Sequence, residues 1–187
     1  TRSVPVRRSD AIALARQPWV LLLDADEWLG EGAAEKLRAL FADGRVESAE
    51  VWTIERRTHF LGKALNFGGW GRESLERIFR QPIRDWPAKV HERLDTDGMR
   101  VETTRVRIEH DTARSEADYR DKLQRYARLF AEERLVNKKR SAKKGPLTPY
   151  LHSGFYLLKN YVLRGGFLDG AMGWRYHRCH ARYVFDK

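Results

Sequence analysis

The sequence has little cysteine and no long hydrophobic run. Cys179 is the single cysteine among 187 residues, so a disulfide within the chain is excluded, in keeping with a reducing compartment. No apolar run approaches the roughly 20 residues that a membrane-spanning helix needs. The first residues, TRSVPVRRSDA, lack the apolar core of a signal peptide. We therefore expect a cytoplasmic protein.

Acidic residues are also in short supply relative to basic ones. The chain carries 26 Asp and Glu against 36 Lys and Arg, a formal net charge of +10. Its 42% hydrophobic content, with 8 Phe, 7 Tyr and 6 Trp, argues against a disordered chain. The basic balance points to an anionic partner. Nucleic acid, an anionic membrane surface and a phosphorylated substrate all meet that requirement.

Two kinds of hydrophobic periodicity divide the chain. In the first 110 residues, apolar runs and period-two alternation predict strands, and one period-3.6 segment predicts a helix. The strands are expected at 19–23, 50–57, 75–80 and 100–109, the helix at 31–42, and a Gly-rich loop at 61–73. Further on, helices are expected at 116–139, 150–163 and from 168. The predicted organisation is an α/β body at 1–112 followed by a helical C-terminal extension at 113–187.

The sharpest feature for function is Asp24-Ala25-Asp26, which directly follows the apolar run Trp19 to Leu23. Open α/β sheets bind ligands at the carboxyl ends of their strands. Carboxylates this close repel one another unless a cation lies between them. Oxygen ligands suit Mg²⁺ or Mn²⁺, which bind one or two carboxylates together with substrate phosphates. The alternative is a solvated strand end or a cluster that caps the helix after Leu29.

Four blocks in this order resemble family 2 glycosyltransferases of the GT-A fold, and more narrowly their lipopolysaccharide-core β-glucosyltransferase-like branch. They are ALARQPWVLLLDADEW at 13–28, RIFR at 77–80 with VHE at 90–92, His110, and FYLLKNYVLRGGFLDGAMG at 155–173. Together they cover nearly the whole chain. The resemblance implies a partial GT-A, Rossmann-like mixed sheet with flanking helices.

The resemblance also implies a reaction. Such enzymes invert the anomeric centre and move a sugar from a nucleotide-diphosphate donor, with a UDP-sugar expected, to a glycan or glycolipid acceptor. Asp26 and Asp24 would hold the Mg²⁺ or Mn²⁺, with Asp24 on the nucleotide-ribose side, and the metal would act as a Lewis acid. This places the protein in bacterial lipopolysaccharide or envelope synthesis, with peripheral attachment to the inner face of the inner membrane.

The catalytic base must come from elsewhere in the chain. The resemblance assigns it to Glu92, which would take the proton of the acceptor hydroxyl. His91 would orient Glu92 or contact a phosphate, unless it is a structural histidine. His110 is expected as a further metal or diphosphate contact, against the alternative of a lone structural histidine.

Other residues are candidates through their own chemistry. The forked guanidinium of Arg77 or Arg80 suits a diphosphate, although these residues share a strand face only if a bulge intervenes. Trp70, in the loop Gly68 to Gly71, is suited to stack on an acceptor sugar or to cap the core. The tail carries His177, Arg178, Cys179 and His180. We interpret these four as a helix surface rather than a zinc site.

The sequence departs from the family pattern in two places. Only 18 residues precede the expected strand at 19–23, whereas the family has a nucleotide-binding half before its DxD. We expect the uracil-binding residues in that half. The segment before RIFR reads Gly71-Arg72-Glu73-Ser74 in place of an acidic, aromatic one, which bears on acceptor specificity.

Two other classes of function compete with the transferase. A basic nucleic-acid-binding protein would explain the net charge and the cluster from Lys138 to Lys144, but no helix-turn-helix, zinc-finger or RNA-binding signature is present, so we do not expect nucleic acid as the partner. A metal-dependent nuclease or phosphotransferase would use Asp24, Asp26 and Glu27. Separately, the apolar segment 150–163, flanked by lysines and Arg164, is expected either on an anionic membrane face or packed against protein.

Overall fold

The computed structural model describes residues 12, 14–71, 73–81, 96–136 and 145–187. The block VHE at 90–92, with both His91 and Glu92, therefore lies outside the described residues. The chain forms two compact units, one of residues 1–56 with 73–110 and the other of 57–72 with 111–187. The division into these units does not test the domain boundary predicted at residue 112, which stays a prediction.

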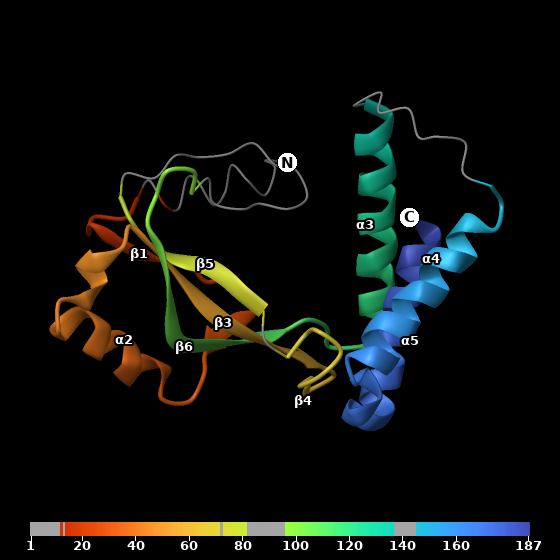
Figure 1. The fold of residues 1–187 in the computed structure, drawn as a ribbon, viewed down its shortest axis with the longest axis horizontal. Helices are drawn as coiled ribbons and strands as arrows, with labels where there is room; N and C mark the ends of the chain where they lie inside the picture. The colour runs from red at the N-terminus through yellow and green to blue at the C-terminus, as the bar shows by residue number, and fades with distance from the viewer. Residues whose placement is uncertain (1–11, 13, 72, 82–95, 137–144) are drawn as a thin grey trace. The chain divides into compact units, whose positions relative to one another are not determined.

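The first unit is built on a mixed sheet (Figure 1). Its strands follow the order β1-β5-β3-β6-β2, with β1 Trp19–Leu21, β5 Glu73–Arg80, β3 Val51–Phe60, β6 Val101–Asp111 and β2 Glu27–Leu29. The pairs β1/β5, β5/β3 and β6/β2 are antiparallel. Strands β3 and β6 run the same way, because backbone bonds join Val51 to Arg100 at one end and His59 to Thr112 at the other.

Apolar side chains cover both faces of this sheet. On one face, α2 (Ala33–Ala42) packs Ala33 and Leu40 against a cluster that includes Trp52, Ile54 and Ile108. On the other face lies a smaller cluster around Val51 and Phe79. Because both faces are covered, β3 begins with four successive buried residues instead of alternating buried and exposed ones. This sheet fixes the strand ends from which the polar residues of the candidate site project.

The α/β expectation for the first part of the chain is confirmed at the level of a mixed sheet with a flanking helix. The strands at 50–57, 75–80 and 100–109 are present and longer than expected. The expected strand 19–23 is shorter, and its side chains are only partly buried. Helix α2 starts at Ala33 rather than residue 31, since Gly32 precedes it with φ 67°. The expected loop 61–73 contains the two-residue strand β4 (Lys63–Ala64), which pairs with β3.

The second unit is mostly helical. It contains α3 (Glu116–Val136), α4 (Thr148–Tyr156), the π-helix η2 (Leu157–Leu163), the 3-10 helix η3 (Gly166–Asp169) and α5 (Gly170–Asp186). Helix α5 packs against both α3 and α4 (Figure 1). The single helix expected at 150–163 is thus an α-helix that continues as a π-helix. Within the described ranges, no helix is both long and apolar enough to cross a bilayer.

Candidate functional site

The Asp24-Ala25-Asp26 motif forms a tight turn between β1 and β2. The backbone N–H of Glu27 donates to the carbonyl of Asp24 at 3.0 Å, which closes the turn. The backbone N–H of Asp24 donates in return to the Glu27 carboxylate at 3.0 Å. Before the turn, Leu22 N–H donates to the carbonyl of Arg77. Hydrogen bonds of the backbone therefore hold the turn in place both before and after the two aspartates.

A buried network of ion pairs lies beneath this turn. The Glu27 side chain is 0% exposed, and its Oε1 accepts from Arg77 at 2.7 Å and from Arg56 at 3.1 Å. Arg77 also donates to Asp24 at 3.1 Å, and Arg56 donates to Glu73 at 2.5 Å. Buried charges persist only when they are paired and hydrogen-bonded. Glu27 is thus the central counter-ion that allows two guanidiniums to lie under the motif.

The electrostatics of the network follow from its composition. Burial opposes the positive charge of Arg56, but the carboxylates of Glu73 and Glu27 outweigh it and raise the pKa of Arg56. Two guanidiniums here face the carboxylates of Asp24, Glu27 and Glu73, and Asp26 adds a fourth acid beside them.

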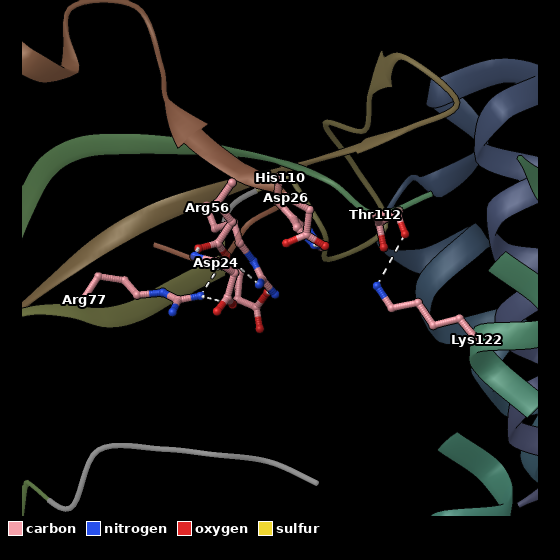
Figure 2. Close-up of polar contacts among 9 residues, drawn as sticks. Asp24, Asp26, Arg56, Arg77, His110, Thr112 and Lys122 are labelled. Atoms are coloured by element: carbon pink, nitrogen blue, oxygen red, sulfur yellow. Dashed lines mark hydrogen bonds and ion pairs between the residues drawn. The ribbon is translucent and has the colours of Figure 1, made fainter. Parts of the chain in front are cut away.

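The second aspartate of the motif lies beside a histidine from a distant strand. In the β2/β6 register, Glu27 is opposite His110, which brings the His110 ring next to Asp26. The distance from His110 Nε2 to Asp26 Oδ2 is 3.4 Å. Figure 2 shows Asp26 and His110 together, with Arg77 directed at Asp24. The Asp26 side chain is 46% exposed, whereas that of His110 is 12% exposed.

The His110 ring has one buried polar atom without a partner. Its Nδ1 makes no hydrogen bond within the described part of the chain. A buried polar atom left unpaired costs about 1–3 kcal/mol, and such exceptions in native proteins call for a functional or solvent explanation. His110 shares this feature with Arg56, Arg77 and Asp111, each of which also has one buried polar atom without a hydrogen bond in the described residues.

These residues can be tested for their fit to a divalent cation. No group of three or more His, Cys, Asp or Glu side chains with metal-site geometry occurs among the described residues. Mg²⁺ and Mn²⁺ bound to nucleotides need fewer, because phosphates and water complete their coordination. The Asp26 carboxylate and the imidazole Nε2 of His110 supply a carboxylate oxygen and a nitrogen 3.4 Å apart, a pair that suits Mn²⁺ better than Mg²⁺. The donor set therefore fits such an ion as a partial site.

The two arginines expected at the diphosphate have different surroundings. Thr53 of β3 is opposite Glu76, and Trp52 is opposite Ile78, so Arg77 is the extra residue of a β-bulge. Its guanidinium is directed at Asp24 and Glu27. Arg80 lies near the start of β1, is exposed, and pairs with Glu47 at 2.7 Å. The structure brings Arg77 to the motif and leaves Arg80 apart; contact of either with a diphosphate remains a prediction.

Trp70 lies in the second unit, within a cluster of aromatic rings. Its ring centroid is 5.6 Å from that of Tyr176 and 4.8 Å from that of His180. Tyr119 and Phe60 complete the same cluster around Tyr176. Trp70 is partly buried there, so its indole contributes to the packing of this unit. Stacking on an acceptor sugar remains a prediction.

The histidines of the tail are buried, which corrects the interpretation of this segment as a helix surface. His180 accepts or donates a short hydrogen bond with the Tyr119 hydroxyl, and His177 Nδ1 is 3.1 Å from the Tyr156 hydroxyl. Burial lowers the pKa of His180 to about 3 and also lowers the pKa of His177. Burial raises the pKa of the Cys179 thiol. The two rings are thus hydrogen-bonded within the core of this unit, and the buried Cys179 thiol lies in the same core.

The tail block 155–173 acts as a brace within the second unit. The Asp169 carboxylate accepts from the backbone N–H groups of Asn66 and Phe67 at 3.0 and 3.1 Å. Gly68 N–H donates to the carbonyl of Arg164 at 3.0 Å. A Cβ on Gly68 would come within 2.2 Å of His177 Nε2, so only glycine lets the loop approach. A Cβ on Gly166, within the block, would likewise come within 2.4 Å of His177 Nε2. These contacts explain Gly166 and Asp169 of the block without a ligand.

Part of the network escaped the sequence analysis. Arg56 and Glu73 were not anticipated, and Glu27 was considered only as a metal ligand. Their common signal is a charged residue within a strand whose neighbours are apolar, a pattern that calls for a buried partner. The partner's identity depends on the strand register, which the sequence alone does not provide.

Comparison with protein-family models gives no match to this sequence.

Proposed function

We propose that this chain carries the metal- and diphosphate-binding part of an inverting glycosyltransferase. Its donor would be a nucleotide-diphosphate sugar, with UDP as the expected nucleotide, and its acceptor a glycan or glycolipid of the bacterial envelope. The observation that carries the proposal is the Asp26–His110 pair at 3.4 Å beside an Asp24 oriented by Arg77. The four sequence blocks that resemble family 2 enzymes support it independently.

In this proposal each residue of the turn has a separate task. Asp26 and His110 would hold Mg²⁺ or Mn²⁺, and that ion, when bound, would stabilise the negative charge of the departing nucleoside diphosphate. Arg77 would hold the Asp24 carboxylate in place, directed toward the donor ribose. Glu27 would hold Arg77 and Arg56 in place and close the turn. The catalytic base proposed from the resemblance, Glu92, is outside the described residues, and so is His91.

The nuclease or phosphotransferase alternative requires a different use of Glu27. It needs the carboxylates of Asp24, Asp26 and Glu27 to share metal ions. Both oxygens of Glu27 accept hydrogen bonds, from Arg56 and Arg77 on one side and from the backbone of Asp24 on the other. A carboxylate held in this way is a poor metal ligand, which favours the transferase.

The nucleic-acid alternative depends on a surplus of unpaired positive charge. Many arginines of the described chain are instead within ion-pair distance of an acid, namely Arg38, Arg45, Arg56, Arg77, Arg80, Arg107, Arg175, Arg178 and Arg182. Pairing of this kind reduces the local charge that a phosphate backbone would meet. A gel shift with plain DNA at several salt concentrations distinguishes the two proposals.

The transferase proposal is tested by isothermal titration of UDP into the protein with and without Mn²⁺. We expect binding that requires Mn²⁺ and is lost in Asp26→Ala. Asp43→Ala is a matched control, because the Asp43 carboxylate is similarly exposed, at 44%, and also lies beside a basic side chain, that of Arg45. Metal-independent binding, or equal binding by both variants, would contradict the assignment of Asp26.

A further inference from the structure

An unusually large share of the exposed apolar side chains lies in one segment of the second unit. Of the eighteen large hydrophobic side chains that are exposed in the described residues, ten fall between residues 147 and 174. They are Leu147, Tyr150, Leu151, Phe155, Leu158, Val162, Leu163, Phe167, Leu168 and Trp174. Scattered exposed hydrophobics are ordinary, but a contiguous set marks an interaction surface.

The helical spacing gathers most of these residues into one stripe, which we call the outer face. Leu147, Leu151 and Phe155 recur every four residues along the start and body of α4. Beyond them, η2 is a π-helix, and Arg164 N–H donates to the carbonyl of Lys159, five residues back. Leu158 and Leu163, both exposed, are five residues apart, which is the spacing of the π-helical hydrogen bond. Leu151, Phe155 and Leu163 are 69%, 63% and 74% exposed.

The opposite side of the same helices already has its partner. Ser153 donates to the carbonyl of Ala181 at 2.9 Å, and the Tyr156 hydroxyl is bonded to His177. The Tyr161 ring contacts those of Trp174 and His177. This inner face therefore packs on α5. A helix that is apolar on both sides, with only one side packed, has an apolar partner for the other.

The described residues 145–168, which include the outer face, carry charge of one sign. Their Lys and Arg residues are Lys159 and Arg164, and none of them is Asp or Glu. Lys159 and Arg164 are exposed beside the stripe. The next acid, Asp169, accepts from the backbone of Asn66 and Phe67 and so is engaged within the unit. A second copy of this chain would bring the same positive surface against itself, which opposes self-association.

We propose that the outer face of α4 and η2 docks the protein onto an anionic lipid bilayer. The aliphatic and aromatic side chains would enter the boundary between headgroups and acyl chains. Lysines and arginines at its border would pair with the anionic headgroups. The helices would lie in the plane of the membrane surface without crossing it.

The test is co-sedimentation of the 187-residue chain with vesicles. One set contains phosphatidylcholine with one third phosphatidylglycerol, and the other contains phosphatidylcholine alone. We expect binding to the anionic vesicles that weakens at high salt. The combined variant Leu151→Gln, Phe155→Gln, Leu158→Gln should bind at least about tenfold more weakly. It lacks three apolar side chains that would be inserted in the membrane.

Two controls make the result specific. Tyr126→Gln with Leu129→Gln removes two exposed apolar side chains from α3 and should leave vesicle binding unchanged. Circular dichroism and urea unfolding check that the triple variant folds, as expected for side chains already in solvent. Lys159→Glu should lower binding to the vesicles that contain phosphatidylglycerol. It should leave binding to vesicles of phosphatidylcholine alone unchanged.

Three outcomes would overturn the proposal. The first is no binding of the unsubstituted protein to anionic vesicles. The second is equal binding by the triple variant. The third is a dimer in analytical ultracentrifugation that the triple variant dissociates, without vesicle binding, which would assign the face to a second copy. None of these outcomes depends on transferase activity.

Discussion

The two units each contain histidines and buried polar groups, but they handle charge in opposite ways. At the turn of the first unit, two guanidiniums pair with the carboxylates of Asp24, Glu27 and Glu73, and the nearby Asp26 side chain is 46% exposed. In the second unit, His177, His180 and Tyr119 are buried, and burial shifts each pKa toward the neutral form. Paired charges beside an exposed carboxylate suit ligand binding, whereas neutral bonded rings suit packing. The comparison teaches that histidine content alone does not locate a site.

The sharpest test of the first unit is removal of its central counter-ion. Glu27→Gln leaves Arg56 and Arg77 buried with one carboxylate partner fewer each. Breaking a buried ion pair costs about 3–5 kcal/mol, and we expect a loss of this size in the free energy of unfolding, measured with urea. Glu31→Gln, at an exposed position, is the matched control and should change stability very little. A Glu27 variant as stable as the control would show that the network is not a buried one.

The second unit should respond most to acid. The pKa of His180 is about 3 in the folded protein, below its ordinary value near 6.5, so below about pH 6.5 the unfolded state binds a proton that the folded state does not. Stability from this residue is therefore complete above about pH 6.5 and falls as the pH is lowered toward 3. Between about pH 7 and pH 4.5 the loss is roughly 2–3 kcal/mol.

This pH effect can be isolated with a variant. Urea unfolding of the unsubstituted protein and of His180→Asn is compared across the acid range. The variant should be less stable at neutral pH, but its stability should fall less steeply as the pH drops. Parallel pH profiles would mean that burial does not lower the pKa of His180, and would contradict a neutral core in the second unit.

A smaller effect is expected where the second unit is tightly packed. A Cβ on Gly173 would lie 2.1 Å from the carbonyl oxygen of Gly166, where η3 meets α5. Gly173→Ala should therefore cost about 1–3 kcal/mol of unfolding free energy through overpacking. Gly154→Ala is its control, because a Cβ there meets nothing within 4 Å in α4. That variant should gain up to about 1 kcal/mol from helix propensity. Similar melting temperatures for both variants would contradict the close approach.

Much of the architecture is predictable because it follows local periodicity. The alternation at 100–109 and the apolar spacing of Tyr119 and Leu123 give β6 and α3 their places. The strand β2 is too short to leave a pattern and exists only through its pairing with β6. The π-helical continuation of α4 likewise has no signal in the hydrophobic period.

The candidate site also combines features that local sequence patterns predict with features that depend on tertiary structure. Asp24 and Asp26 are recognisable because they follow an apolar run, and His110 because it ends an alternating strand. Their association depends on the register between β2 and β6, and on a bulge at Arg77 that the sequence allows but does not require. The buried state of His177 and His180 depends on long-range packing against Tyr119 and Tyr156, which no local pattern in α5 predicts.

The central claim is that the Asp26–His110 pair of the first unit, and not the histidines of the second, binds the metal. Electron spin-echo spectroscopy of Mn²⁺ with UDP and the protein detects a directly bound imidazole nitrogen. We predict a nitrogen modulation that is lost in His110→Gln and retained in His177→Gln. Absence of the modulation, or its persistence in His110→Gln with loss in His177→Gln, would contradict the assignment and move the site to the second unit.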